Sequence, residues 1–346
     1  MKDMDFSAFD AIIDCRSPAE YAEDHIPGAI SAPVLDDAER AAVGTMYKQV
    51  SPFDAKKRGA ALVAKNVARH VETLFADKPR GWRPLVYCWR GGKRSGAMAH
   101  ILREIGWDAR ALEGGYRAYR RWVVDELEKM PARYEFVVIH GPTGSGKSRL
   151  LAALREAGAQ VLDLEGLAAH RGSVLGELPG QPQPTQKGFE SLLRHALSRL
   201  DAGRPVFVEG ESKKIGQRQV PEALIARMRA SECLLLDTAP AARVQLLTDE
   251  YRHFLGDTRS LERQLDCLVA LHGQEKIASW KSLAARGAWE DLVTRLLAEH
   301  YDPAYRRSAT RNFARLAQAR SVRIESADAT AFREAARSLM EQAVPA

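Results

Sequence analysis

The sequence is poor in cysteine and contains no long apolar run. Four cysteines are scattered over 346 residues, at Cys15, Cys88, Cys233 and Cys267. Their spacing fits neither a metal site nor the disulfide framework of a secreted domain. No stretch approaches the ~20 apolar residues that span a bilayer, and the polar first residues are not followed by the apolar core of a secretion signal. These absences predict a cytoplasmic chain with no membrane span and no dedicated metal site.

The composition is that of a folded protein with room for two domains. Hydrophobic residues make up 45% of the chain and charged residues 28%, which is typical of globular proteins. A length of 346 residues allows about two cores of ordinary size. The formal charge of +6 suits a polyanionic partner such as RNA, although charge alone does not identify one. No pattern in the sequence specifies an oligomeric state.

Short apolar runs alternate with longer helical periods in both halves of the chain, which predicts an α/β fold with parallel sheets. The break near residues 130–133 predicts one domain at 1–130 and a second at 134–346. From about Ala239 onward the pattern is mostly helical. The expected strands are Ala11–Asp14, Pro84–Tyr87, Phe136–His140, Gln160–Leu164, Pro205–Glu209 and Cys233–Asp237.

The segment 86–95 reads as a strand, a cysteine, a basic loop with two glycines and the start of a helix. Backbone N–H groups of such a loop and the positive end of the helix dipole form a site for anions. Cys88 at this position is expected to be a nucleophilic thiolate. The loop supplies three cationic candidates for the same site, Arg90, Lys93 and Arg94.

Three further sequence strings in the first domain resemble those of a known family. Residues 14–21 (DCRSPAEY) with 25–30 (HIPGAI), and the later 112–116 (LEGGY), resemble the signature of rhodanese-like domains. The resemblance implies a parallel α/β fold and a sulfur or selenium adduct on Cys88. Five residues separate Cys88 from Arg94, one more than in common sulfurtransferase loops. Rhodanese-fold phosphatases and arsenate reductases share this loop length, so the loop alone leaves a chalcogen carrier and a phosphatase both open.

The second domain opens with a phosphate-binding loop. Residues 141–148 (GPTGSGKS) match G-x-x-x-x-G-K-[ST] between an apolar strand and a helix, which is the context this motif requires. In this motif the backbone wraps the phosphates, the lysine adds a mobile charge and the serine can ligate Mg²⁺. The predicted phosphate or diphosphate ligands are Gly141, Thr143, Gly144, Ser145, Gly146, Lys147 and Ser148.

Acidic residues after the next two strands are candidates for the Mg²⁺ side of this loop. They are Asp163, Glu165, Glu209 and Glu211. Glu209 ends a strand where a Walker-B acid is expected, and each of the four could equally be a helix cap or a surface charge. No residue of the loop recognises a nucleotide base, so a nucleotide and a prenyl diphosphate both remain compatible with it.

The order of these motifs, with four other strings, resembles the bacterial tRNA 2-selenouridine synthase family over nearly the whole chain. The strings are residues 43–52 (VGTMYKQVSP), 163–173 (DLEGLAAHRGS), 208–216 (VEGESKKIG) and 300–305 (HYDPAY). The resemblance implies a rhodanese-like domain followed by a P-loop NTPase-like domain with a helical C-terminal part.

The same resemblance implies a two-step reaction on tRNA that carries 2-thiouridine at the wobble position. The sulfur is first geranylated from geranyl diphosphate, and the S-geranyl group is then replaced by selenium from selenophosphate, which requires a selenophosphate supplier. We assign the first step to the phosphate-binding loop and selenium delivery to Cys88 with its cations. Candidate tRNA or substrate contacts are His170, Arg171, Lys213 and Lys214.

Two other functions stay open from the residues. One is an ATP-dependent kinase or sulfurtransferase with a fused rhodanese-like or phosphatase-like module, which would turn over ATP without tRNA. The other is a nucleotide-sensing regulator whose cysteine loop only binds anions, although a pure binding module needs no nucleophile.

Overall fold

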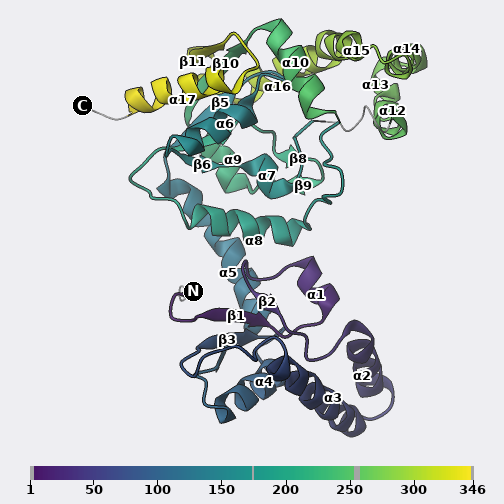
Figure 1. Ribbon diagram of the computed structural model, residues 1–346, viewed down its shortest axis with the longest axis vertical. Helices are drawn as coiled ribbons and strands as arrows, with labels where there is room; N and C mark the ends of the chain where they lie inside the picture. The colour runs from purple at the N-terminus through teal and green to yellow at the C-terminus, as the bar shows by residue number, and fades with distance from the viewer. Residues whose placement is uncertain (1–3, 174, 253–257, 344–346) are drawn as a thin grey trace. The chain divides into compact units, whose positions relative to one another are not determined.

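The computed structural model describes residues 4–173, 175–252 and 258–343, and only the backbone of residues 308–312, 314 and 343. The chain folds as two compact units (Figure 1). The first comprises Met1–Leu127 with Pro184–His195, and the second comprises Glu128–Gln183 with Ala196–Ala346. Each unit has its own parallel sheet and its own apolar core, which confirms the predicted α/β class.

The first unit is built on a four-stranded parallel sheet in the order β2-β1-β3-β4. Its strands are β1 (Ala11–Asp14), β2 (Ile30–Ser31), β3 (Pro84–Tyr87) and β4 (Arg110–Ala111). Its main helices are α1 (Pro18–Glu23), α2 (Asp37–Gln49), α3 (Pro52–Glu72), α4 (Lys93–Glu104) and α5 (Gly115–Lys129). All four residues of β3 are buried, as expected for a central strand covered on both faces. The ends of β1 and β3 pair in register, with Asp14 opposite Tyr87.

The first unit also includes most of α8 (Gln186–Leu197), a helix that comes from the later part of the sequence. Lys187 pairs with Glu23 at 2.6 Å, and Glu190 pairs with Arg120. The guanidinium of Arg194 lies 3.7 Å from the centre of the Trp122 ring. Several charged and aromatic contacts therefore hold this helix against α1 and α5.

The second unit contains a five-stranded parallel sheet in the order β11-β10-β5-β7-β6. Its strands are β5 (Phe136–His140), β6 (Gln160–Leu162), β7 (Val206–Glu209), β10 (Glu232–Thr238) and β11 (Arg320–Ile324). The chain leaves the central strand β5 to one side and later returns to its other side. Ligands of open α/β sheets bind at the carboxyl end of the strands where the order reverses in this way.

Helices surround this sheet and share an apolar core with it (Figure 1). A further apolar cluster is formed mainly by helical residues between Leu247 and Tyr301. A short hairpin, β8 (Lys214–Ile215) with β9 (Arg218–Gln219), precedes the later helices. The helices close to the sheet are α6 (Lys147–Glu156), α7 (Leu164–Ala168), α9 (Glu222–Arg229), α10 (Pro240–Glu250) and α17 (Ala329–Ala343). The others are α12 (Thr258–Asp266), α13 (Val269–His272), α14 (Gln274–Ala285), α15 (Trp289–Leu296) and α16 (Asp302–Asn312). Shorter 3₁₀ or π segments are Met130–Arg133, Leu297–Tyr301 and Ala314–Gln318.

Two details differ from the pattern read in the sequence. The strand expected at Gln160–Leu164 ends at Leu162, because Asp163 caps the next helix by accepting a hydrogen bond from the N–H of Gly166 at 2.7 Å. The expectation of mostly helical structure after Ala239 missed β11, an edge strand whose two arginines and short length hide its apolar positions.

Candidate functional site

Cys88 begins the loop that joins β3 to α4, and it is 4% exposed. Gly91 in this loop has φ +65°, and a Cβ there would lie 2.5 Å from the carbonyl oxygen of Leu112. Only glycine fits such a left-handed, crowded position without strain. Helix α4 starts directly after Gly92, so its N-terminus faces the loop.

The LEGGY string and the residue after it donate backbone hydrogen bonds to the Cys88 loop. The N–H of Tyr116 donates to the carbonyl of Cys88 at 2.8 Å, and the N–H of Arg117 donates to the carbonyl of Trp89 at 3.0 Å. A Cβ on Gly115 would lie 2.2 Å from the Cys88 carbonyl oxygen. Gly115 therefore allows the close backbone approach that fixes the position of the cysteine.

The Cys88 sulfur lies among hydrogen-bond donors that lower its pKa to about 4. The main cause is the neighbouring Cys15 thiol; the Ser95 hydroxyl, 3.2 Å from the sulfur, and the backbone N–H groups of Ser95 and Gly92 add to it. Burial acts in the opposite direction and is outweighed. Cys88 is therefore a thiolate at neutral pH, which is the nucleophilic form.

The three cations predicted for this loop are placed differently. Arg94 is half-buried and pairs with Glu20 at 3.0 Å, and Arg40 pairs with the same carboxylate at 3.0 Å. Arg90 and Lys93 are exposed. Arg94 is thus held by Glu20 of α1, whereas the side chains of Arg90 and Lys93 are open to solvent.

The alkylation rate of Cys88 by iodoacetamide should stay nearly constant between about pH 6 and pH 8, because a thiolate with a pKa of about 4 is already ionised there. An ordinary thiol should speed up roughly 50- to 100-fold over the same interval. The exposed Cys267 is the internal control. Ser95→Ala removes one donor, so the pKa of Cys88 should rise. A profile for Cys88 that follows that of Cys267 would contradict the assignment; peptide mass spectrometry measures both.

The phosphate-binding loop spans Gly141–Ser148, between β5 and α6, at the carboxyl edge of the sheet. Gly144 and Gly146 have φ +77° and +84°, and a Cβ on Gly144 would lie 2.7 Å from the Leu247 side chain. The Lys147 ammonium donates to the carbonyl of Gly141 at 3.0 Å, so the lysine folds back over the loop. The Ser145 backbone is fixed as well, because its carbonyl accepts a hydrogen bond from the Thr238 hydroxyl at 2.8 Å.

A buried arginine outside the motif also holds this loop. Arg243 of α10 donates to the carbonyl of Thr143 at 2.8 Å and pairs with Asp302 at 2.6 Å. The local sequence motif could not predict this contact, because it joins residues 100 positions apart. Asp302 lies in the HYDPAY string, and its place beside Arg243 gives that string a physical role.

Three of the four acidic candidates gather beside the loop serine. The Ser148 hydroxyl donates to the Glu165 carboxylate at 2.9 Å, and the N–H of Glu165 donates to Glu209 at 2.7 Å. A Cβ on Gly172 would lie 2.6 Å from Glu211 and 2.9 Å from Glu165, so these two carboxylates approach the same glycine. Burial and the neighbouring Glu211 raise the pKa of Glu165 to about 8. Burial first, and then nearby Glu165, raises the pKa of Glu209 well above its usual range. Asp163 instead caps α7 and lies 3.5 Å from Arg155.

The candidate tRNA contacts fall into two groups. His170 is buried and accepts a hydrogen bond from the N–H of Gly172 at 3.2 Å, and Arg171 donates to the carbonyl of Glu250 at 2.7 Å. Both therefore border the acidic residues beside the phosphate-binding loop. Lys213 pairs with Glu222 at 2.5 Å, and Lys214 is exposed on the β8–β9 hairpin.

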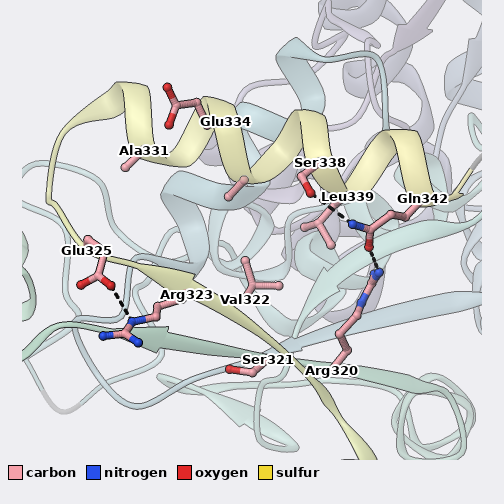
Figure 2. A pocket seen from close by; sticks show the side chains of 11 residues that line it. Arg320, Ser321, Val322, Arg323, Glu325, Ala331, Glu334, Ser338, Leu339 and Gln342 are labelled. Carbon is pink, nitrogen blue, oxygen red and sulfur yellow. Dashed lines mark hydrogen bonds and ion pairs between the residues drawn. The ribbon is translucent and has the colours of Figure 1, made fainter.

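A surface groove of about 450 Å³ lies elsewhere, between β11 and α17 (Figure 2). Its arginines already have partners: Arg323 pairs with Glu325, and Arg320 pairs with Gln342. None of the predicted site residues lines this groove. In the described ranges, no cluster of three or more His, Cys, Asp or Glu side chains is arranged to hold a metal ion. No helix within those ranges is both long and apolar enough to cross a membrane.

Two family models match successive parts of the chain. Residues 1–121 match the rhodanese-like domain, and residues 134–264 match the tRNA 2-selenouridine synthase AAA domain. The tRNA 2-selenouridine synthase of Sulfurovum sp. (strain NBC37-1) is 31% identical over 336 residues, which cover 88% of this chain and 90% of that protein. The chain belongs to the tRNA 2-selenouridine synthase family.

Other members of the tRNA 2-selenouridine synthase family align over a shorter stretch. The synthase of Nitrosomonas europaea is 37% identical over 253 residues, 71% of this chain and 64% of that protein. The synthase of Marinobacter nauticus is 37% identical over 69% of this chain and 65% of that protein. In these two alignments the chain spans slightly less than two thirds of the relative's length.

Proposed function

We propose that this member of the tRNA 2-selenouridine synthase family converts 2-thiouridine at the tRNA wobble position into 2-selenouridine by way of an S-geranyl intermediate. The observation that supports this most is that one chain contains two loops suited to anions. One begins with Cys88, whose pKa is lowered to about 4, and in the other Lys147 folds back over a glycine-rich loop. Four free cysteines fit the reducing cytoplasm, where tRNA is modified.

The phosphate-binding loop suits the first step. The 2-thio sulfur attacks C1 of geranyl diphosphate, the C–O bond breaks, and the electron pair leaves with the diphosphate. Backbone N–H groups of residues 141–148 and the Lys147 ammonium would stabilise the charge that develops on that leaving group. The Ser148 hydroxyl, with Glu165 2.9 Å away, offers oxygen ligands that fit a Mg²⁺ ion carried in by the diphosphate.

The Cys88 loop suits the second step. Geranylation turns the sulfur of the base into a thioether, which departs as a geranylthiol when selenium attacks C2. The loop N–H groups, Arg94 and the exposed Arg90 and Lys93 would bind selenophosphate or the phosphate that it releases. The Cys88 thiolate would attack the phosphorus of selenophosphate, so that the P–Se bond breaks and selenium leaves as hydroselenide, which attacks C2. Water then hydrolyses the phosphate from the Cys88 sulfur and restores the thiol. His170, Arg171, Lys213 and Lys214 are the proposed contacts to tRNA or substrate.

Nucleoside mass spectrometry tests this function. The protein is incubated with tRNA that carries 2-thiouridine, first with geranyl diphosphate alone and then with added selenophosphate. We expect S-geranyl-2-thiouridine in the first reaction and its conversion to 2-selenouridine in the second. ATP turnover with no change in either nucleoside would instead support the kinase or sulfurtransferase alternative.

A further inference from the structure

Cys15 is a buried thiol that the proposed reaction leaves unused. It directly follows β1, as Cys88 directly follows β3, and these two strands pair in parallel with Asp14 opposite Tyr87. The register therefore places Cys15 opposite Cys88. The N–H of Cys15 donates to the carbonyl of Tyr87 at 3.0 Å, and its sulfur lies 3.0 Å from the same carbonyl oxygen. The rhodanese-like signature includes the position of Cys15 but gives it no role.

The geometry of this pair permits a disulfide. Neighbouring strands lie about 4.8 Å apart, and disulfides join residues whose Cα atoms are about 4.4–6.8 Å apart. Both side chains point into the same apolar cluster of the first unit, and Cys15 is fully buried. Both thiols are free in this structure. No side chain needs to cross the sheet for the two sulfurs to meet.

We propose that Cys15 is the resolving thiol of Cys88: once the Cys88 sulfur is bonded to a second sulfur, as in a mixed disulfide, Cys15 attacks it, releases the outer thiol and leaves a Cys15–Cys88 disulfide. This inference rests on the nucleophilic role proposed for Cys88. With a mixed disulfide as the adduct, the bond between Cys88 and the outer sulfur breaks and a Cys15–Cys88 bond forms. The electron pair leaves on the outer thiolate, which takes up the proton lost by Cys15. An external thiol then returns the pair to the reduced state.

The charges around the two cysteines determine when Cys15 can lose its proton and attack. Burial and the adjacent Cys88 thiolate keep the pKa of Cys15 well above its usual range, so Cys15 is a protonated donor while Cys88 is free. An adduct neutralises Cys88 and removes the repulsion and the hydrogen bond that hold the proton on Cys15. Arg94, which favours the Cys15 thiolate, remains beside the pair, and Asp14 opposes it. Cys15 therefore becomes a better nucleophile only after Cys88 has been modified.

Oxidised glutathione provides the test on the full-length protein. After exposure and quenching with N-ethylmaleimide, tryptic digestion without reductant should yield peptides 3–16 and 81–90 joined by a disulfide. Cys15→Ala and Cys15→Val should abolish this product, and the glutathione adduct on Cys88 should persist about tenfold longer or more, because the intramolecular attack is lost. Cys267→Ser, at an exposed cysteine, should leave the cross-link unchanged.

The outcomes separate this inference from the function on which it rests. A wild-type protein that accumulates the Cys88 glutathione adduct without a cross-link would overturn the role of Cys15 and leave Cys88 as a nucleophile. A Cys88 that reacts neither in the wild type nor in the Cys15 variants would overturn both roles. Two Cys15 replacements are included because valine preserves apolar packing where alanine leaves a cavity, and thermal unfolding reports whether each variant is folded.

Discussion

Lys147→Ala should lower the rate of tRNA geranylation at least about 100-fold, which corresponds to about 2.7 kcal/mol of lost transition-state stabilisation. The Lys147 ammonium lies over the phosphate-binding loop, 3.0 Å from the Gly141 carbonyl, where it can follow the negative charge that gathers on the departing diphosphate. Mass spectrometry of tRNA nucleosides measures the S-geranyl product over time.

The matched control for this variant is Arg155→Ala on the same helix. Arg155 is exposed, and its ion pair with Asp163 is long, at 3.5 Å. Such surface ion pairs contribute little to stability. The control should geranylate at the wild-type rate. Both proteins should retain the alkylation profile of Cys88, which shows that the first unit is folded. Full geranylation by Lys147→Ala would remove the phosphate-binding loop from the first step.

Cys88→Ser should leave geranylation intact and lower selenation by about three orders of magnitude or more, as expected when a nucleophile is removed. Serine is nearly isosteric, but its hydroxyl remains protonated at neutral pH, whereas the thiol of Cys88 has a pKa of about 4. S-geranyl-2-thiouridine should therefore accumulate in the presence of selenophosphate. Cys267→Ser is the control and should not accumulate it. Normal selenation by a folded Cys88→Ser protein would contradict the role of this cysteine.

The sequence alone predicted the elements whose pattern is local. Apolar runs placed β1, β3 and β5 correctly, and the glycines of both loops predicted the two turns that precede α4 and α6. Such turns depend on a few consecutive residues, because a strand end, a glycine with positive φ and a helix start are all specified locally.

Contacts between distant segments could not be read in the same way. The buried Arg243–Asp302 pair behind the phosphate-binding loop and the hydrogen bond from Ser148 to Glu165 depend on the order of strands in the sheet. The position of Cys15 opposite Cys88 depends on the register of β1 and β3. Helix α8 joins the first unit although its sequence lies within the second half of the chain. Local pattern carries no information about any of these.

The most direct test of two separable anion sites uses the two single variants in sequence. Cys88→Ser makes S-geranylated tRNA from geranyl diphosphate, and the purified tRNA is then given to Lys147→Ala with selenophosphate. The account predicts conversion to 2-selenouridine at close to the wild-type rate, because the second protein needs only its Cys88 loop. No conversion by Lys147→Ala, with the wild-type protein active on the same tRNA, would contradict the claim that each site performs its own step.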